Sequence, residues 1–273
     1  MFVEGRLLHT LPEGNSIYGI AVLDNLIYLL RDKASYKISV YDTDYYRLQR
    51  RLDVPGLNSV SDMTACAHNY CLYIAGDRCI HRAALPDAAD VRKWQGHDDH
   101  PGLSVTDTHS VLVTCQEDQM IKEFNTNGKL LREIELPTYF VNPQHAIQLS
   151  DGDFIVSYGE TDDDPHCVCL MDSDGHVVKS YGGSRRSKRR RLDSPLRLAV
   201  DGNGFVVVVV DMDCRVLLLS PTLHYVCDVV SCEELTWTPI RVFLDVDERR
   251  LYVAENKWED DEFTAGRVLV FSV

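Results

Sequence analysis

Six polar residues recur along the chain at a nearly regular interval. Each opens a similar phrase, in which a turn residue and the polar residue are followed by three or four apolar residues. The spacings are 44, 42, 41, 52 and 44 residues, and the six positions are Tyr18, Asp62, Ser104, His145, Arg197 and Arg241. If the repeats gather around one axis, the arginines and the histidine form an arc of donors that could hold a phosphate, a carboxylate or a stacked base. The alternative is structural ion pairing of Arg197 and Arg241 with carboxylates such as Asp62.

The same six positions offer little catalytic chemistry. They contain one carboxylate and one histidine, whereas a metal-dependent hydrolase or lyase needs several converging ligands. No Ser-His-Asp or paired-carboxylate pattern recurs at matched places in the repeats. The run from Asp172 to Gly175 resembles a calcium loop but lacks the downstream glutamate, and it suits a hairpin turn. We therefore expect no metal, no cofactor and no catalytic residue, and we predict that the chain is not an enzyme.

Two kinds of charged segment stand out. The segment Ser184–Arg191 carries six cations, which are Arg185, Arg186, Lys188, Arg189, Arg190 and Arg191. It lengthens one repeat spacing, so we expect an exposed insertion that clamps an anion, directs the protein to the nucleus, carries a regulated phosphate on Ser187, or is merely solvated. The acidic runs Glu160–Asp164 and Glu259–Glu262 are expected in loops on one face. Trp258 and Phe263 flank the second run, which indicates a contact surface.

The pattern within each repeat predicts β-strands. Each one contains up to four short β-rich runs within 40–50 residues, and no helical period appears. The repeats begin near residues 16, 60, 102, 142, 194 and 238. The sixth repeat lacks a fourth run, and the segment Gly5–Leu11 resembles the missing run. The fourth run of the second repeat is least clear, and Val91–Gln95 is the best candidate.

This pattern predicts an all-β, six-bladed β-propeller formed by one domain over residues 1–273. Its blades are four-stranded and antiparallel, and an N-terminal strand at residues 5–11 completes the last blade and closes the ring. Closure removes the free sheet edges that an open array would expose. A pair of β-sandwiches is the alternative, but it does not explain the split repeat.

The composition is that of a globular, acidic protein. Of 273 residues, 45% are hydrophobic, and 28 basic against 42 acidic residues give a net charge of −14. The longest apolar run, Phe205–Val210, has the length of a strand, so we expect no membrane span. An acidic chain is repelled by nucleic acid unless its basic residues gather in one patch. The nine cysteines show no repeated CxxC spacing, which favours free thiols in a reducing, cytoplasmic location.

The repeat resembles the NHL repeat. The segment Ser194–Ser220 keeps the Pro, the Leu-Ala-Val-Asp phrase, the Gly turn and the Arg-Val pair of that repeat, although Asp213-Cys214-Arg215 stands where the Asn-His-Leu tripeptide is expected. NHL propellers often form the C-terminal domain of tripartite-motif proteins, where they bind protein or RNA. The resemblance therefore implies a binding domain, stand-alone or part of a longer chain.

Two functions are favoured by these observations, and a metal-dependent propeller hydrolase or lyase is the third and least favoured alternative. The first is a non-catalytic module whose loop-bearing face binds a protein partner. The second is a single-stranded RNA-binding propeller, whose basic face would combine Arg197, Arg241, Arg215 and His145 with the Ser184–Arg191 segment. The acidic net charge favours the first function.

Overall fold

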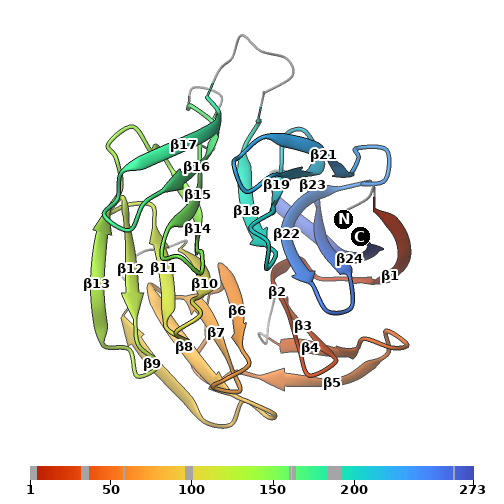
Figure 1. Ribbon diagram of the computed structural model, residues 1–273. Helices are drawn as coiled ribbons and strands as arrows, with labels where there is room; N and C mark the ends of the chain where they lie inside the picture. Colours follow the sequence, from red (N-terminus) through yellow and green to blue (C-terminus); the bar gives the residue numbers. More distant parts are fainter. Residues whose placement is uncertain are drawn as a thin grey trace.

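Six four-stranded antiparallel sheets are arranged as blades around a central channel (Figure 1). The computed structural model describes residues 5–31, 37–57, 59–95, 101–159, 161, 164–183, 192–260 and 262–273. All secondary structure in these residues is β-strand. The predicted six-bladed propeller is therefore confirmed.

The blades follow the chain order. The first blade consists of β2 (Ile17–Leu23), β3 (Leu26–Arg31), β4 (Lys37–Asp42) and β5 (Leu48–Asp53). The second consists of β6 (Asp62–Cys66), β7 (Cys71–Gly76), β8 (Cys79–Ala84) and β9 (Val91–Gln95). The third consists of β10 (Gly102–Val105), β11 (Val111–Cys115), β12 (Met120–Phe124) and β13 (Leu130–Glu135). The next two consist of β14 (Pro143–Gln148), β15 (Phe154–Tyr158), β16 (Cys167–Met171) and β17 (Val177–Gly182); and β18 (Pro195–Val200), β19 (Val206–Val210), β20 (Arg215–Leu219) and β21 (Tyr225–Val230). The expected fourth strand of the second repeat is thus β9.

The sixth blade joins the two ends of the described chain. It consists of β22 (Thr238–Asp245), β23 (Arg250–Glu259), β24 (Glu262–Ser272) and the N-terminal strand β1 (Arg6–Gly14). The register of β1 against β24 pairs Leu11 with Val268 and Gly14 with Gly266. This arrangement confirms the predicted ring closure, and the closing strand is longer than the predicted segment 5–11.

Strand position explains the apolar pattern of each blade. The second strands lie inside the blades and are largely buried, as in β19, whose five valines are all fully buried. The fourth strands face solvent and are mostly exposed, as in β5, where only Leu52 is buried. Turns between strands use acceptor side chains, and Asp201 accepts hydrogen bonds from the main-chain nitrogens of Asn203 and Phe205 at 2.9 and 2.8 Å.

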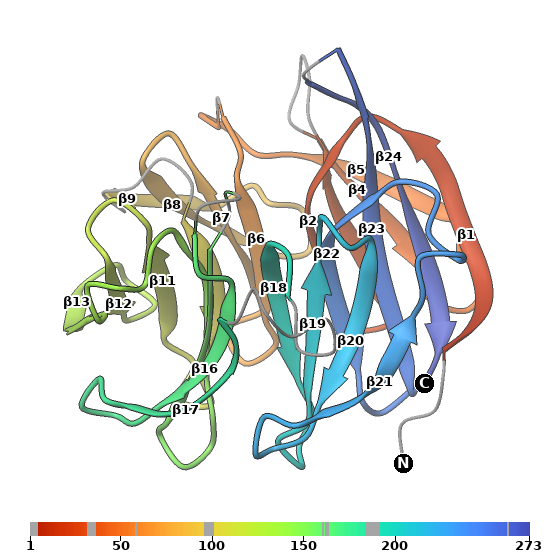
Figure 2. The ribbon, with the colours of Figure 1, turned by 90° about the horizontal axis from the view of Figure 1, so that it is seen from above.

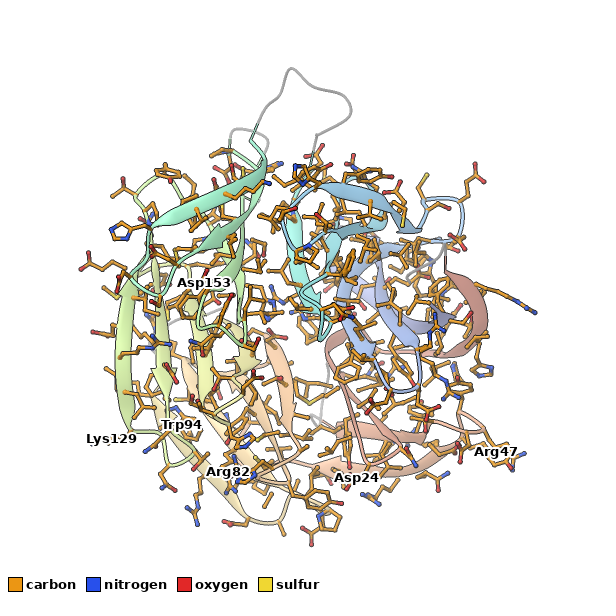
Figure 3. All side chains as sticks on the ribbon, in the orientation of Figure 1. Asp24, Arg47, Arg82, Trp94, Lys129 and Asp153 are labelled. Carbon is orange, nitrogen blue, oxygen red and sulfur yellow. The ribbon has the colours of Figure 1, made fainter. Side chains whose placement is uncertain are left out.

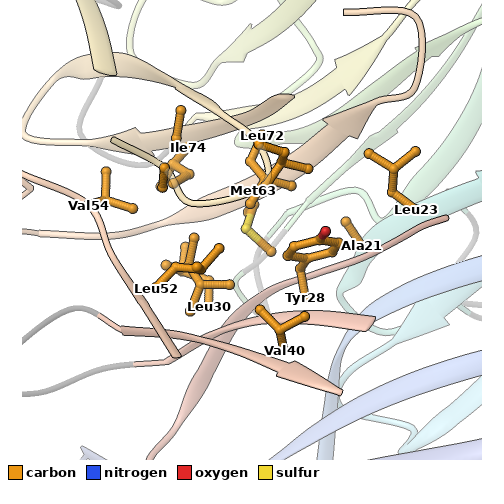
Figure 4. Close-up of a cluster of buried hydrophobic side chains, with 14 of the residues drawn as sticks. Ala21, Leu23, Tyr28, Leu30, Val40, Leu52, Val54, Met63, Leu72 and Ile74 are labelled. Atoms are coloured by element: carbon orange, nitrogen blue, oxygen red, sulfur yellow. The ribbon is translucent and has the colours of Figure 1, made fainter. Parts of the chain in front are cut away.

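The core is divided among the blade interfaces. Each neighbouring pair of blades buries its own apolar cluster, and Figure 4 shows the cluster between the first and second blades, which includes Tyr28, Leu30 and Met63. The cluster between the sixth and first blades includes Leu11 from β1. The closing strand therefore adds core contacts as well as backbone hydrogen bonds.

The inner strands approach closely where the blades converge. A Cβ atom added to Gly19 would lie 2.4 Å from Met63 Cβ, so this place in β2 accepts only glycine without a shift of the neighbouring blade. Other charged side chains lie at the outer rim, as Arg47 and Lys129 do in Figure 3. In the described part of the chain, no helix is long and apolar enough to cross a membrane.

Candidate functional site

The predicted polar residues meet in the central channel. Each comes from an innermost strand, and the strand order around the axis brings together positions that are far apart in the sequence (Figure 1). A cavity of 240 Å³ lies among these strands. Five of the six predicted residues line it, and they are Asp62, Ser104, His145, Arg197 and Arg241.

Asp62 is the centre of this cluster. Its side chain is 3% exposed, and its Oδ2 accepts a hydrogen bond from the main-chain nitrogen of Leu103 at 2.9 Å. Two guanidinium groups share the same carboxylate, because Arg241 Nε lies 3.2 Å from Oδ1 and Arg197 Nε lies 3.4 Å from Oδ2. The ion pairing considered as the structural alternative is therefore present.

The arginines also bind main-chain oxygens of several blades. Arg241 Nε donates to the Tyr18 oxygen at 2.8 Å, Nη1 donates to the Ile240 oxygen at 2.8 Å, and Nη2 donates to the Ser61 oxygen. Arg197 Nη1 donates to the Gln144 oxygen at 3.0 Å. Together these contacts link inner strands across the channel, so the cluster stabilises the closed ring.

Burial and charge shape the ionisation of the cluster. Burial alone would raise the pKa of the Asp62 carboxyl, but the charges of Arg197 and Arg241 outweigh burial and lower it. Burial lowers the pKa of Arg241 to about 10, and the neighbouring charge of Arg197 acts in the same direction. Arg241 is therefore still a cation at neutral pH.

His145 is held in one neutral form. Its Nε2 lies 3.0 Å from the main-chain oxygen of Leu103, and its Nδ1 lies 3.3 Å from the main-chain nitrogen of Leu198. Because a main-chain N–H can only donate, Nδ1 must accept, and the proton sits on Nε2. Burial, together with the charge of Arg197, lowers the pKa of His145 to about 4.

Other predicted site residues lie elsewhere. Tyr18 contributes its main-chain oxygen to Arg241, and Ser104 donates its hydroxyl to the Ala146 oxygen at 2.7 Å. Arg215 does not join the channel cluster, because it lies on the third strand of its blade and pairs with Asp213 and Asp228 at 3.1 and 3.2 Å. The basic segment Ser184–Arg191 lies outside the described residues.

A second feature is the hairpin of β23 and β24, which we call the projecting hairpin (residues 250–272). The register pairs Asn256 with Thr238 near the start of β22, and β23 continues to Glu259 beyond that level. The hairpin therefore rises above the face on which the inner strands begin, and Figure 2 shows its tip at the upper edge of the molecule. The acidic run at Glu259–Glu262 was expected in a loop, but Glu259 and Glu262 are paired strand residues.

The tip of the projecting hairpin carries an aromatic pair. Trp258 and Phe263 are opposite each other in the register, and their ring centroids lie 4.8 Å apart in an edge-to-face arrangement. Trp258 is nevertheless 56% exposed. Lys257 Nζ pairs with Glu259 at 2.7 Å. Asp260 and Glu262 add two more carboxylates, so the described charged residues of the tip are mainly acidic.

Buried polar groups fix the base of this hairpin. The fully buried side chain of Asn256 accepts a hydrogen bond from the Ile17 nitrogen at 2.9 Å and donates one to the Ile17 oxygen at 3.0 Å. The fully buried Glu255 accepts a bond from Arg267 Nε at 2.5 Å. Sequence reasoning named none of these residues, although two polar residues directly after the apolar run Leu251–Ala254 were a signal of buried polar contacts.

Metal ligation finds no support in the described residues. No group of three or more His, Cys, Asp or Glu side chains among them is placed to hold a metal ion. The cysteines are free thiols, and seven of the nine lie within strands or are the first or last residue of a strand.

Solved structures similar to this chain share its fold. Virginiamycin B lyase from Staphylococcus aureus is 12% identical with a TM-score of 0.66, and the match covers 99% of this chain and 100% of that chain. A streptogramin B lyase is 15% identical with a TM-score of 0.63 over 99% of this chain and 86% of that one. A protein of unknown function from Bacteroides caccae is 13% identical with a TM-score of 0.60, with 81% and 83% covered. No family model and no curated protein matches the sequence.

These comparisons define the chain as a six-bladed β-propeller and correct one prediction. The prediction that the chain is not an enzyme is contradicted, because propellers that match nearly its whole length are lyases. The scarcity of carboxylates at the channel mouth was too narrow a ground for excluding catalysis. At 12–15% identity the likeness shows the fold alone, so it does not transfer a reaction. The NHL resemblance stays a prediction.

Proposed function

We propose that this propeller binds a protein partner through the face on which the projecting hairpin stands. The observation that carries the proposal is the exposed Trp258 on a rigid base. Interface hot spots are enriched in tryptophan, and binding costs least entropy when the contact residue is already held in place. The buried contacts of Asn256 and Glu255 supply that rigidity.

The charge around Trp258 favours a basic partner segment. Glu259, Asp260 and Glu262 stand against the single cation Lys257 at the described part of the tip. Cationic side chains are attracted to such carboxylates, and they also bind the face of an indole ring. RNA is the less favoured ligand, since the acidic tip repels phosphate.

A peptide titration tests the proposal. The probe is a fluorescent peptide of alternating arginine and glycine, and its affinity is measured by anisotropy at physiological salt for the wild type and for Trp258→Ala. We expect Trp258→Ala to weaken binding by at least about 30-fold, the size of a hot-spot loss. A matched control is Tyr45→Ala, because Tyr45 is 72% exposed beside Asp42 and Asp44 on the opposite face.

The outcomes separate specific docking from general attraction to an acidic protein. Equal affinity of the wild type and Trp258→Ala would show that the peptide binds by net charge alone and would contradict the proposal. A photo-crosslinking residue at position 258, compared with one at position 45, extends the test to the cell. Proteins crosslinked from position 258 should be lost when Glu259 and Glu262 are changed to glutamine.

A further inference from the structure

The channel cluster has an excess of one positive charge on largely buried side chains. Asp62 contributes one negative charge, Arg197 and Arg241 contribute two positive charges, and His145 is neutral at pH 7. Asp62 and Arg197 are only 3% and 7% exposed. An uncompensated charge is costly to bury, because the protein interior solvates it poorly. The net charge of the cluster would therefore become zero if one monovalent anion bound beside it.

Donor groups of Arg197 are available for that anion. Its Nε faces Asp62 Oδ2 at 3.4 Å and its Nη1 donates to main-chain oxygens, whereas among the described residues no acceptor binds its Nη2. The two N–H groups of Nη2 can give charge-assisted hydrogen bonds to a carboxylate. The positive end of the cavity thus has both the charge and the donors for one acidic group.

The rest of the cavity has a different character. Beyond the polar layer the same inner strands contribute mostly apolar side chains, which are Ile20, Ala65, Val105, Ile147, Val200 and Leu244. The volume of 240 Å³ equals that of about eight water molecules at about 30 Å³ each. A ligand that fills this space has an apolar body, whereas an inorganic anion would leave the apolar walls without contacts.

We propose that the channel cavity binds a small organic monoanion, a carboxylate on a compact apolar body, whose oxygens receive hydrogen bonds from Arg197. One negative charge neutralises the cluster, and the apolar body packs on the inner strands below it. This site is separate from the projecting hairpin, and the proposal does not depend on the protein partner.

The charge distribution also favours one entrance. The turns at the opposite end of the inner strands carry Asp24, Asp245 and Asp247, which line a second cavity of 450 Å³. These carboxylates repel an approaching anion. The arginine cluster lies towards the face of the projecting hairpin, so a ligand that enters there reaches Arg197 without passing these three carboxylates, although Glu259, Asp260 and Glu262 at the hairpin tip also repel anions.

Calorimetric titration of the full chain with benzoate tests the proposal. The buffer contains no chloride, so that no small inorganic anion competes, and the pH is 7. We expect Arg197→Met to weaken benzoate binding by about tenfold or more, since it removes the excess charge and the donors together. Arg197→Lys keeps the charge and should bind with intermediate affinity. The matched control Arg215→Met removes an arginine outside the channel and should bind as the wild type does.

Two further probes decide the ligand class. Benzamide has the shape of benzoate without its charge and should bind at least about tenfold more weakly. Inorganic phosphate should also bind more weakly than benzoate. Tighter binding of phosphate would overturn the assignment of an apolar body. Absence of benzoate binding to a folded wild type, or equal binding by Arg197→Met, would overturn the site itself.

Discussion

His145 makes the stability of the ring depend on pH. In the folded chain its Nδ1 accepts a bond from Leu198, and Arg197 lies beside it, so a second proton has no acceptor and meets a like charge. The carboxylate of Asp62 opposes this effect but does not cancel it. The pKa of His145 therefore falls from 6.5 to about 4. An unfolded chain binds the proton at a higher pH than the folded chain does, so acid favours unfolding.

The magnitude follows from linkage between protonation and folding. Because the folded-state pKa is depressed, the stabilisation is present above pH 6.5 and is lost progressively as the pH falls towards 4. The whole difference corresponds to about 3 kcal/mol, since one pKa unit is worth about 1.4 kcal/mol. Between pH 7 and pH 5 the expected loss is about 2 kcal/mol.

Urea unfolding at pH 7 and pH 5 measures this loss, and His145→Gln is the matched variant. Glutamine offers one donor and one acceptor for Leu103 and Leu198, but it does not titrate. The other histidines contribute equally in both proteins, so the difference between the two pH dependences isolates His145. The wild type should lose about 2 kcal/mol more than His145→Gln. Equal losses would refute the assignment of a neutral, buried His145.

Three further predictions concern the ring. Deletion of residues 1–11 removes most of β1 and the buried Leu11, so the melting temperature should fall markedly, and a variant that melts like the parent would contradict the role of β1 in closure. Gly19→Ala should lower the free energy of unfolding by about 1–3 kcal/mol through overpacking, whereas Gly202→Ala, where no atom lies within 4 Å of the added Cβ, should be nearly neutral in the same urea titration. Asn256→Ala leaves the buried nitrogen and oxygen of Ile17 without partners and should cost about 2 kcal/mol or more; a loss below about 0.5 kcal/mol, the size of an ordinary surface substitution, would contradict this role.

The fold could be predicted from the sequence because its signals are local. A blade needs alternating apolar runs and turn residues such as Asp201 and Gly204, and these patterns are visible within about ten residues. Ring closure was also predictable. The last repeat lacks its fourth strand and an extra strand precedes the first repeat, so these two parts of the chain can be paired in one consistent way. The extra length of β23 and β24 was not predictable in this way. Acidic residues at Glu259 and Glu262 disfavour strands, and only pairing across the hairpin holds them in one.

Five of the six polar residues that the repeat pattern identifies in the sequence line the channel cavity, because each occupies the same place in its repeat, whereas Tyr18 contributes only its main-chain oxygen. Only the tertiary structure decided what those residues do there. Arg241 and Asp62 are 179 positions apart, and their contact depends on the ring placing the sixth and second blades on the two sides of the first blade. No local pattern records that two arginines share one carboxylate, or that main-chain oxygens of other blades bind most of the donors of Arg241. The charges in the channel interact strongly only in the closed ring, because closure buries them together and removes the water that would otherwise screen each one.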